Sequence, residues 1–247
     1  KKIKKIIKNR KIILLEDSCE SQGASINKIK VGNHGLASSF SFYWGHHLTT
    51  IEGGMISTND RIFYNTCLLK RSHGLARELP KQMHAKIKKE NKNIDFKFLF
   101  LNCGFNFRNT EINAYLGRFQ LPQINNWIKI RNTNYNNFYK ICLKYKSHFL
   151  LTKIKGMSSF VLPFIFKRKE IKIKFEKLLI KNGIETRPFI AGNLLEQPFL
   201  RKYKTKKLPN ASFLHSNSFY IGNNQFVDEI KLNKLQKLMY SFFNERS

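Results

Sequence analysis

The chain has 247 residues, of which 42% are hydrophobic, and its formal net charge is +29. This apolar content excludes a disordered chain and suffices for one large or two modest domains, each with its own core. A nucleic-acid partner would explain such a charge, but lysine supplies 34 of the 45 basic residues and arginine only 11. Arginine is the residue suited to bidentate contacts with phosphate and guanine. We therefore attribute the charge to compositional bias and expect no specific nucleic-acid partner; a basic nucleic-acid-binding protein stays the alternative from another class.

Cysteine usage and hydropathy indicate the compartment. The four cysteines are far apart in the sequence and form no CxxC pair: Cys19, Cys67, Cys103 and Cys142. We expect reduced thiols in a cytoplasmic protein and no metal site. No apolar run approaches the roughly 20 residues that cross a membrane, and no hydrophobic segment of a signal peptide follows the basic N-terminus. Because the chain begins without methionine inside a lysine-rich amphipathic stretch, we expect it to be the interior of a longer protein.

The first half of the chain predicts short strands followed by helices. A continuous apolar run at 12–15 is typical of a parallel strand that is buried on both faces. Ligands of open α/β sheets bind at the carboxyl ends of such strands, so the acidic residues that follow are well placed for a site: Glu16, Asp17 and Glu20. We further predict strands at 37–44 and 53–58, a helix at 60–72, and a lysine-rich loop at 76–100.

The second half predicts longer helices alternating with strands. Thr110 is a candidate N-cap of a helix, and a long helix is predicted at 122–145. Beyond it, the pattern predicts two strands, at 159–166 and 184–189, and two helices, one ended by Gly183 and one at 226–243. This alternation indicates an α/β fold in two parts, residues 1–125 and a smaller α/β domain of residues 126–247.

Three segments carry a resemblance to a known family. EDSCESQGA (16–24), SFSFYWGHHLTTIEGG (39–54) and GFNFRNTEINAYLG (104–117) occur in the order and spacing of the DegT/DnrJ/EryC1/StrS sugar aminotransferases, which are pyridoxal 5'-phosphate (PLP) enzymes. The resemblance implies an α/β fold similar to aspartate aminotransferase. Residues 1–125 would be the C-terminal part of the PLP-binding large domain, followed by the small α/β domain, with about the first third of a typical member absent.

The resemblance also implies roles for four residues. Asp17 matches the carboxylate beside the pyridine nitrogen, whose protonation makes the ring an electron sink. Glu20 matches a position that packs by the ring and its hydroxyl, and Ser41 matches the serine that binds the cofactor phosphate. Asn106 resembles an asparagine that reaches the same phosphate from the partner subunit. The expected assembly is therefore a homodimer with shared active sites.

The double histidine changes the expected reaction. In family members that transfer an amino group, the motif is close to NKNLTTGEGG, and its lysine holds PLP covalently. Aligning on Leu48, Thr49 and Thr50 places His46 at that lysine. Imidazole forms no stable Schiff base but moves protons near neutral pH. A branch of the family, the 3-dehydratases of 3,6-dideoxysugar synthesis, has this substitution, and the segments IETRPFIAGN and LHSNSFYIGNNQ also resemble that branch.

For that branch, the resemblance implies non-covalent PLP that glutamate, the amino donor, converts to pyridoxamine 5'-phosphate (PMP). The substrate is a nucleotide-linked 4-keto-6-deoxyhexose, which loses its C3 hydroxyl while His46 moves the proton. His73, in KRSHG, matches a position near the active site and is a candidate catalytic residue. Arg187, in ETRPF, is a candidate for binding the donor carboxylate or the sugar nucleotide, with a surface ion pair as the alternative. His47 is expected to pack locally.

Three related alternatives stay open. A true aminotransferase is disfavoured by His46. A ferredoxin-coupled CDP-sugar 3-dehydratase shares the histidine but carries an iron-sulfur cluster, and the scattered cysteines offer no suitable ligand group. An inactive fragment is the third. Both GDP and CDP remain candidates for the nucleotide of the substrate.

Overall fold

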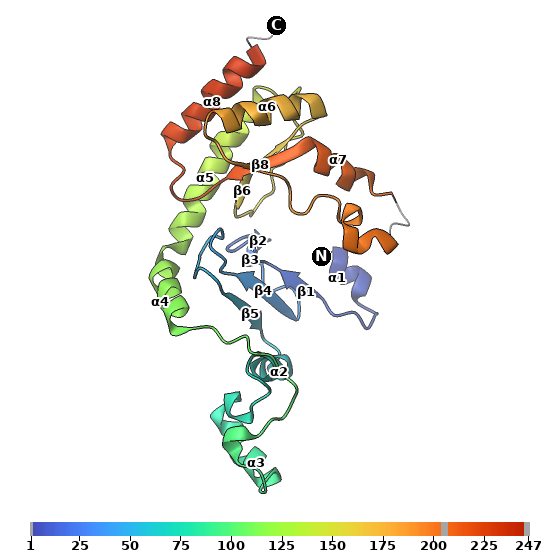
Figure 1. Cartoon of the computed structure of the whole chain (residues 1–247), viewed down its shortest axis with the longest axis vertical. Helices are drawn as coiled ribbons and strands as arrows, with labels where there is room; N and C mark the ends of the chain where they lie inside the picture. The colour runs from blue at the N-terminus through green and yellow to red at the C-terminus, as the bar shows by residue number, and fades with distance from the viewer. Residues whose placement is uncertain (1, 204–206, 245–247) are drawn as a thin grey trace. The chain divides into compact units, whose positions relative to one another are not determined.

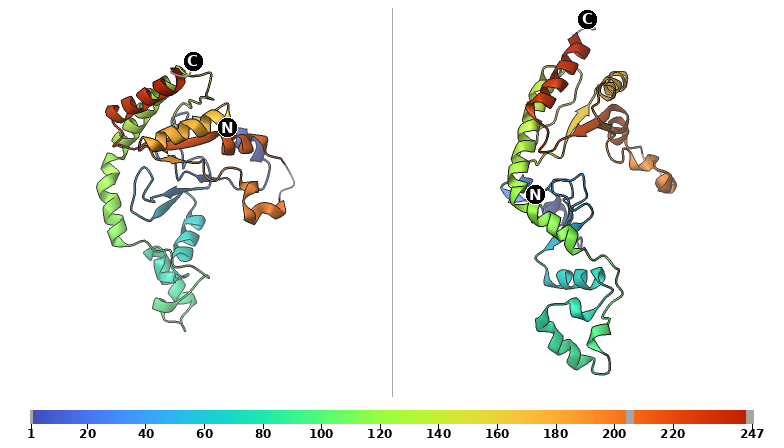
Figure 2. Two further views of the ribbon diagram at one scale, coloured as in Figure 1. Left: turned by 45° about the horizontal axis from the view of Figure 1, so that its top comes forward. Right: turned by 60° about the vertical axis from the view of Figure 1, so that its left-hand side comes forward.

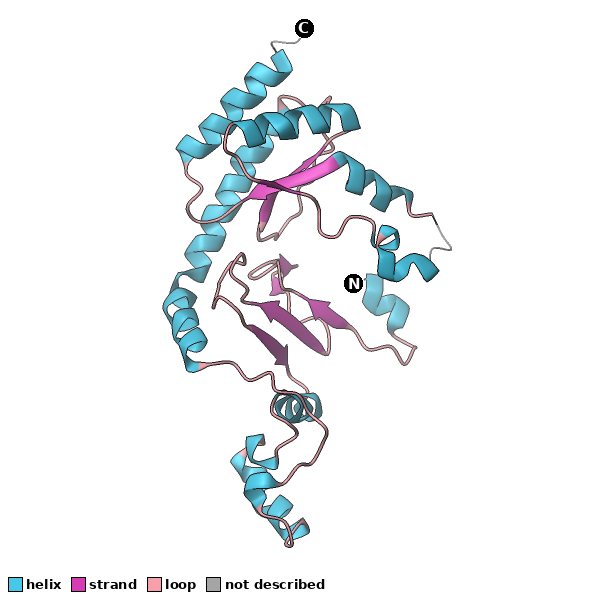
Figure 3. Cartoon of the chain, viewed as in Figure 1, coloured by secondary structure: helices cyan, strands magenta, loops and turns pink. Residues whose placement is uncertain are grey.

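The computed structural model describes residues 2–203 and 207–244. The chain divides into two compact units, one of residues 1–22 and 26–122 and one of residues 23–25 and 123–247. Both contain helices and strands, as Figure 3 shows in cyan and magenta. The assignment of residues 1–125 and 126–247 to a large and a small domain stays a prediction.

A three-stranded sheet forms the centre of the first unit (Figure 1). The strands β1 (Leu15–Asp17) and β4 (Ala37–Ser41) pair in parallel, and β5 (Gly54–Thr58) pairs antiparallel with β4. The prediction of a strand at 12–15 was displaced, because the pairing begins at Leu15 and includes the acidic residues. Ile13 is 69% exposed, so the apolar run is not covered on both faces in this chain.

A short helix precedes β1, and a small hairpin follows it. The helix α1 spans Lys2–Ile7. A two-stranded hairpin consists of β2 (Ser25–Ile26) and β3 (Ile29–Lys30). Its two turn residues, Asn27 and Lys28, have φ of 53° and 69°, as a type I′ hairpin turn requires.

Capping side chains define where the helices of the first unit begin. The carboxylate of Asp60 accepts the backbone N–H of Phe63 at 2.7 Å and caps α2 (Arg61–Arg71). Thr110 accepts the N–H of Asn113 at 3.3 Å and caps α4 (Glu111–Gln120), as predicted from the sequence. In both cases the side chain satisfies a donor that has no partner inside the helix.

The prediction of a loop at 76–100 was wrong. This segment contains α3 (Lys81–Glu90) and belongs to a small satellite core with the buried residues Ala76, Leu79, Ile87 and Leu99. The lysines of α3 lie on its solvated side while Met83 and Ile87 pack inward. Two single 3₁₀ turns flank the helix, at Ala76–Glu78 and Phe96–Phe98.

The second unit has its own sheet, which is antiparallel in the order β6-β8-β7. Its strands are β6 (Val161–Ile165), β7 (Thr186–Arg187) and β8 (Ser218–Gly222). Its helices are α5 (Ile124–Leu143), α6 (Lys169–Lys181), α7 (Pro209–Asn217) and α8 (Glu229–Asn244). Three 3₁₀ segments complete the described elements, at Leu121–Gln123, Leu194–Glu196 and Pro198–Tyr203. The predicted helices at 122–145 and 226–243 correspond to α5 and α8, whereas α7 and β8 were not predicted.

Phenylalanines fill the core of the second unit. Phe164 on β6 meets Phe138 of α5 edge-on, with ring centroids 5.0 Å apart, and Phe175 of α6 at 5.4 Å. Phe166 and Phe219 are also fully buried in this cluster. The helix α8 packs against α5 and α6, and Figure 2 shows α8 in red beside α5 in yellow-green.

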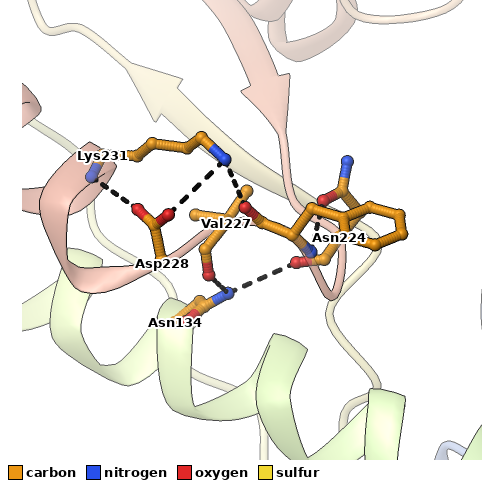
Figure 4. A network of polar contacts seen from close by, with 6 residues as sticks. Asn134, Asn224, Val227, Asp228 and Lys231 are labelled. Atoms are coloured by element: carbon orange, nitrogen blue, oxygen red, sulfur yellow. Dashed lines mark hydrogen bonds and ion pairs between the residues drawn. The ribbon is translucent and has the colours of Figure 1, made fainter.

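A polar network fixes the loop between β8 and α8. The Asn134 side chain donates to the carbonyls of Val227 at 2.9 Å and Asn224 at 3.5 Å (Figure 4). Asp228 accepts the backbone N–H of Lys231 at 2.9 Å and lies 3.7 Å from its ammonium. That backbone bond is the first cause that holds the pKa of Asp228 below its ordinary value. The network joins the start of α8 to α5.

Candidate functional site

The ends of two parallel strands bring Asp17 and Ser41 to one edge of the sheet. Asp17 ends β1 and is paired in register with Ser39 of β4, two residues before Ser41. Asp17 Oδ1 accepts the backbone N–H of Cys19 at 3.2 Å and the Ser39 hydroxyl at 3.4 Å. Hydrogen bonds from the Cys19 thiol and backbone are the main causes that lower the pKa of the Asp17 carboxyl. Asp17 is therefore an exposed anion at neutral pH.

Ser41 is held by its neighbours through its backbone and its hydroxyl oxygen. The Ser41 Oγ accepts the N–H of Tyr43 at 3.2 Å, and the Ser41 carbonyl accepts the amide of Gln22 at 2.8 Å. Gln22 is buried, with 8% of its surface exposed, and was not predicted as a site residue. The Ser41 hydroxyl hydrogen remains available as a donor to an anion.

His46 lies in the loop that joins β4 to β5. Two backbone bonds close this loop, from Phe42 N to the Gly53 carbonyl at 2.9 Å and from Thr50 N to the Phe42 carbonyl at 2.8 Å. The His46 N–H donates to the Tyr43 carbonyl at 3.0 Å, and the two rings meet edge-on at 6.0 Å. His46 is half-buried, whereas its neighbour His47 is 1% exposed. No lysine occurs between Lys30 and Lys70, so none accompanies His46 in this loop.

The helix α4 fixes the shape of this loop. The Gln120 amide donates to the Thr49 carbonyl at 2.6 Å and accepts the Thr49 N–H at 3.1 Å. The Asn113 amide donates to the carbonyls of Thr50 and Glu52, both at 2.7 Å. Sequence reasoning missed both side chains. Their separation of seven residues puts them on one face of α4, and this was the signal that could have identified them.

His73 and Asn106 are brought together at a different place in the first unit. His73 follows α2 with φ of 60°, and its N–H donates to the Phe105 carbonyl at 2.8 Å. Ser72 and Asn106 form an isolated antiparallel bridge, and the Asn106 side chain accepts Nε of Arg108 at 3.3 Å. A non-glycine residue at positive φ is uncommon and is enriched at functional sites. Both side chains are exposed.

The remaining candidates are more loosely placed. Glu20 is exposed in the turn after β1. Arg187 belongs to β7 of the second unit, and its guanidinium lies 3.0 Å from the Glu185 carboxylate. The surface ion pair that was the alternative for Arg187 is thus formed. Glu16, which we expected beside Asp17, instead accepts three backbone N–H groups of the segment 32–35.

The described residues, 2–203 and 207–244, offer neither a membrane span nor a metal-binding group of side chains. None of their helices has the length and apolar character needed to cross a membrane. Within the same ranges, no three His, Cys, Asp or Glu side chains gather as ligands for a metal ion.

The DegT/DnrJ/EryC1/StrS aminotransferase family matches residues 1–233. The chain belongs to this family. The resemblance recognised from three motifs is therefore confirmed. GDP-4-keto-6-deoxy-D-mannose 3-dehydratase of Escherichia coli O55:H7 is 37% identical over 241 residues, which are 92% of this chain and 61% of that enzyme. This chain thus spans less than two thirds of that relative, and it is similar to the 3-dehydratase branch, as the motifs indicated.

Solved structures confirm the fold of a PLP-dependent transferase. The E. coli GDP-4-keto-6-deoxy-D-mannose-3-dehydratase with bound hydrated PLP superposes with a TM-score of 0.84 at 33% identity. The match covers 96% of this chain and 62% of that one. A structure of GDP-4-keto-6-deoxymannose-3-dehydratase with a trapped PLP-glutamate geminal diamine gives the same TM-score and identity, over 96% and 63% of the two chains.

Proposed function

We propose that the protein containing this chain is a PLP/PMP-dependent 3-dehydratase. Its substrate would be a nucleotide-linked 4-keto-6-deoxyhexose, which loses the C3 hydroxyl during synthesis of a dideoxysugar for the O-antigen of lipopolysaccharide. The observation that carries this proposal is His46 in a loop without lysine, between Ser41 and the Thr49-Thr50 pair. Imidazole accepts and donates protons near neutral pH and leaves the cofactor without a covalent attachment.

The residues at the strand ends fit PLP. When bound, PLP supplies an electron sink, provided that its pyridine nitrogen stays protonated. Asp17 is suited to that task because it is a carboxylate at neutral pH, and its hydrogen bonds from Cys19 lower its pKa further. The Ser41 hydroxyl has a hydrogen to donate to the phosphate.

His46 is the group that moves the proton. Its backbone is fixed through Tyr43 and through the loop that α4 holds, so the imidazole has a defined position. A half-buried imidazole can take a proton in one step and return it to the oxygen of the departing C3 hydroxyl in the next. His73 and Glu20 are proposed as further site residues on the resemblance alone.

Glutamate is proposed as the amino donor and a GDP-sugar as the substrate, because a similar solved structure contains a PLP-glutamate adduct and the E. coli relative is a GDP-4-keto-6-deoxy-D-mannose 3-dehydratase. Arg187 is our candidate for binding the donor carboxylate or the diphosphate. Its guanidinium already pairs with a carboxylate, that of Glu185, and is 51% exposed. A planar guanidinium binds either anion through two parallel hydrogen bonds.

We further propose a cytoplasmic homodimer in which Asn106 reaches the partner's cofactor. Asn106 lies between two exposed aromatic residues, Phe105 at 57% and Phe107 at 71% exposure. Their rings are stacked at 5.0 Å with an interplanar angle of 10°. Aromatic residues are enriched at protein interfaces relative to the rest of the surface. The test mixes inactive His46 and Asn106 variants of the full-length protein: hybrid dimers with one intact site should regain part of the activity. No recovery despite verified subunit exchange would refute the shared site.

Borohydride reduction tests the dehydratase assignment itself. If His46 replaces the attachment lysine, reduction of the full-length holoenzyme should leave no PLP covalently bound to any lysine. His46→Lys should permit that attachment and abolish dehydration of the nucleotide sugar. Detection of a pyridoxyl-lysine in the unchanged protein by mass spectrometry would contradict the proposal and favour an aminotransferase.

A further inference from the structure

Glu16 accepts three backbone hydrogen bonds near the proposed cofactor site, yet no step of the reaction uses it. Its Oε1 accepts the backbone N–H groups of His34 at 2.6 Å and Gly35 at 2.7 Å, and its Oε2 accepts that of Gly32 at 3.0 Å. Three backbone donors that converge on one carboxylate form an anion-binding nest. Here a side chain of the same unit occupies the nest.

The segment that Glu16 holds leads directly into β4. The nest comprises residues 32–35, and β4 begins at Ala37. Gly35 is confined at this point, because a Cβ there would lie 2.4 Å from the carbonyl oxygen of Leu14. The Leu36 N–H donates to the same oxygen at 2.8 Å. The carboxylate therefore acts at the point where β4 first meets β1.

Register matters here because β1 has only three residues. A slip of one residue would turn every side chain of β4 to the opposite face of the sheet. Side chains alternate along a strand, so Glu16 and Asp17 point to opposite faces. Strand β1 thus holds β4 through the side chain of Glu16 and presents Asp17, the proposed partner of the pyridine nitrogen, on its other face.

We propose that Glu16 is a positioning residue that sets the register of β4 against β1 and thereby places Asp17 and Ser41 for the cofactor. This inference rests on the proposed function. Glu16 does not contact the cofactor itself. Its carboxylate fixes the strand pairing, which is short at this point. A shift of β4 here would separate Asp17, the proposed partner of the pyridine nitrogen, from Ser41, the proposed hydrogen-bond donor to the phosphate.

The test measures PLP binding by Glu16→Gln in the full-length protein. The dissociation constant for PLP should rise roughly ten- to hundredfold, the range found when outer residues of a site are removed. Glu78→Gln is the matched control, because Glu78 is also half-buried in the first unit and forms ion pairs with Arg71 and Arg77. Glu16→Asp keeps the charge with a shorter reach; if the glutamine variant fails to fold, the aspartate variant should still bind PLP with a higher dissociation constant than the unchanged protein, and an unchanged constant would overturn the inference.

A double-mutant cycle separates positioning from a general structural role. If Glu16 acts through Asp17, the loss caused by Glu16→Gln should be clearly smaller in an Asp17→Asn background, because residues coupled through the position of a shared backbone are non-additive. Fully additive losses, or unchanged PLP binding by Glu16→Gln, would overturn the inference while leaving the proposed function intact.

If the unchanged protein bound no PLP, the proposed function would fail. Amide exchange over residues 32–41 would then decide: faster exchange in Glu16→Gln supports the register role, and unchanged exchange refutes it.

Discussion

Replacing Gln120 by alanine should loosen the loop that carries His46. The Gln120 amide makes two hydrogen bonds to the backbone of Thr49, at 2.6 and 3.1 Å. Each neutral bond contributes about 0.5–1.5 kcal/mol net, so the variant loses roughly 1–3 kcal/mol of the free energy that holds the loop against α4. A change of that size raises the population of the open loop about 5- to 150-fold.

Native-state amide exchange measures this opening. Thr50 is the reporter, because its N–H donates to the Phe42 carbonyl at 2.8 Å and not to Gln120. Gln123→Ala is the control, since the Gln123 side chain is exposed and makes no capping bond. Exchange of the Thr50 amide should accelerate in Gln120→Ala and stay unchanged in the control. If the Thr49 amide alone became faster, the helix would not be holding the loop, and the reasoning would be refuted.

Three further predictions follow from burial and charge. Phe175→Ala should reduce the free energy of unfolding by about 3–5 kcal/mol in urea titrations, because the ring is fully buried, whereas the 70%-exposed Phe226 should tolerate alanine. Burial raises the pKa of the Cys142 thiol, so a thiol reagent should modify exposed Cys103 in the native protein and Cys142 only after unfolding. Because the pKa of Asp17 is lowered from 3.8, its contribution to PLP affinity should stay constant between about pH 5 and 8 and disappear only below its ordinary pKa; the difference in affinity between the unchanged protein and Asp17→Asn measures this.

The sequence predicted the start of a helix where a capping side chain determines it. The side chains of Asp60 and Thr110 both cap the first turn of a helix. The segment 76–100 was misread because its lysines dominated the pattern. Its apolar residues at 79, 83 and 87 have helical spacing, and Leu79, Met83 and Ile87 do pack into the satellite core. A helix with a narrow apolar stripe is thus easily mistaken for a polar loop.

Sequence motifs predicted the residues proposed to carry the chemistry of the candidate site, but they did not predict the side chains that position those residues. Asp17, Ser41 and His46 were proposed from motifs and stay predictions as site residues, whereas the side chains that contact them were not predicted. Ser39 and Gln22 act through contacts with residues 19 to 22 positions away. Such contacts depend on strand register, which no local pattern specifies when β1 has three residues.

The unusual charge of the chain has a consequence at this site. Glu16, Asp17 and Glu20 supply three of its 16 acidic residues within five positions, against 45 basic residues in all. A basic surface attracts anionic ligands, and the cofactor phosphate and the sugar diphosphate are both anions. The same field would leave a pyridine nitrogen without its proton unless a carboxylate stood beside it. In our proposal Asp17 supplies that carboxylate, whereas the Glu16 carboxylate accepts three backbone N–H groups of residues 32–35. We therefore propose two separate tasks for these acidic residues, a chemical one for Asp17 and a structural one for Glu16, in a chain whose net positive charge favours the binding of phosphate.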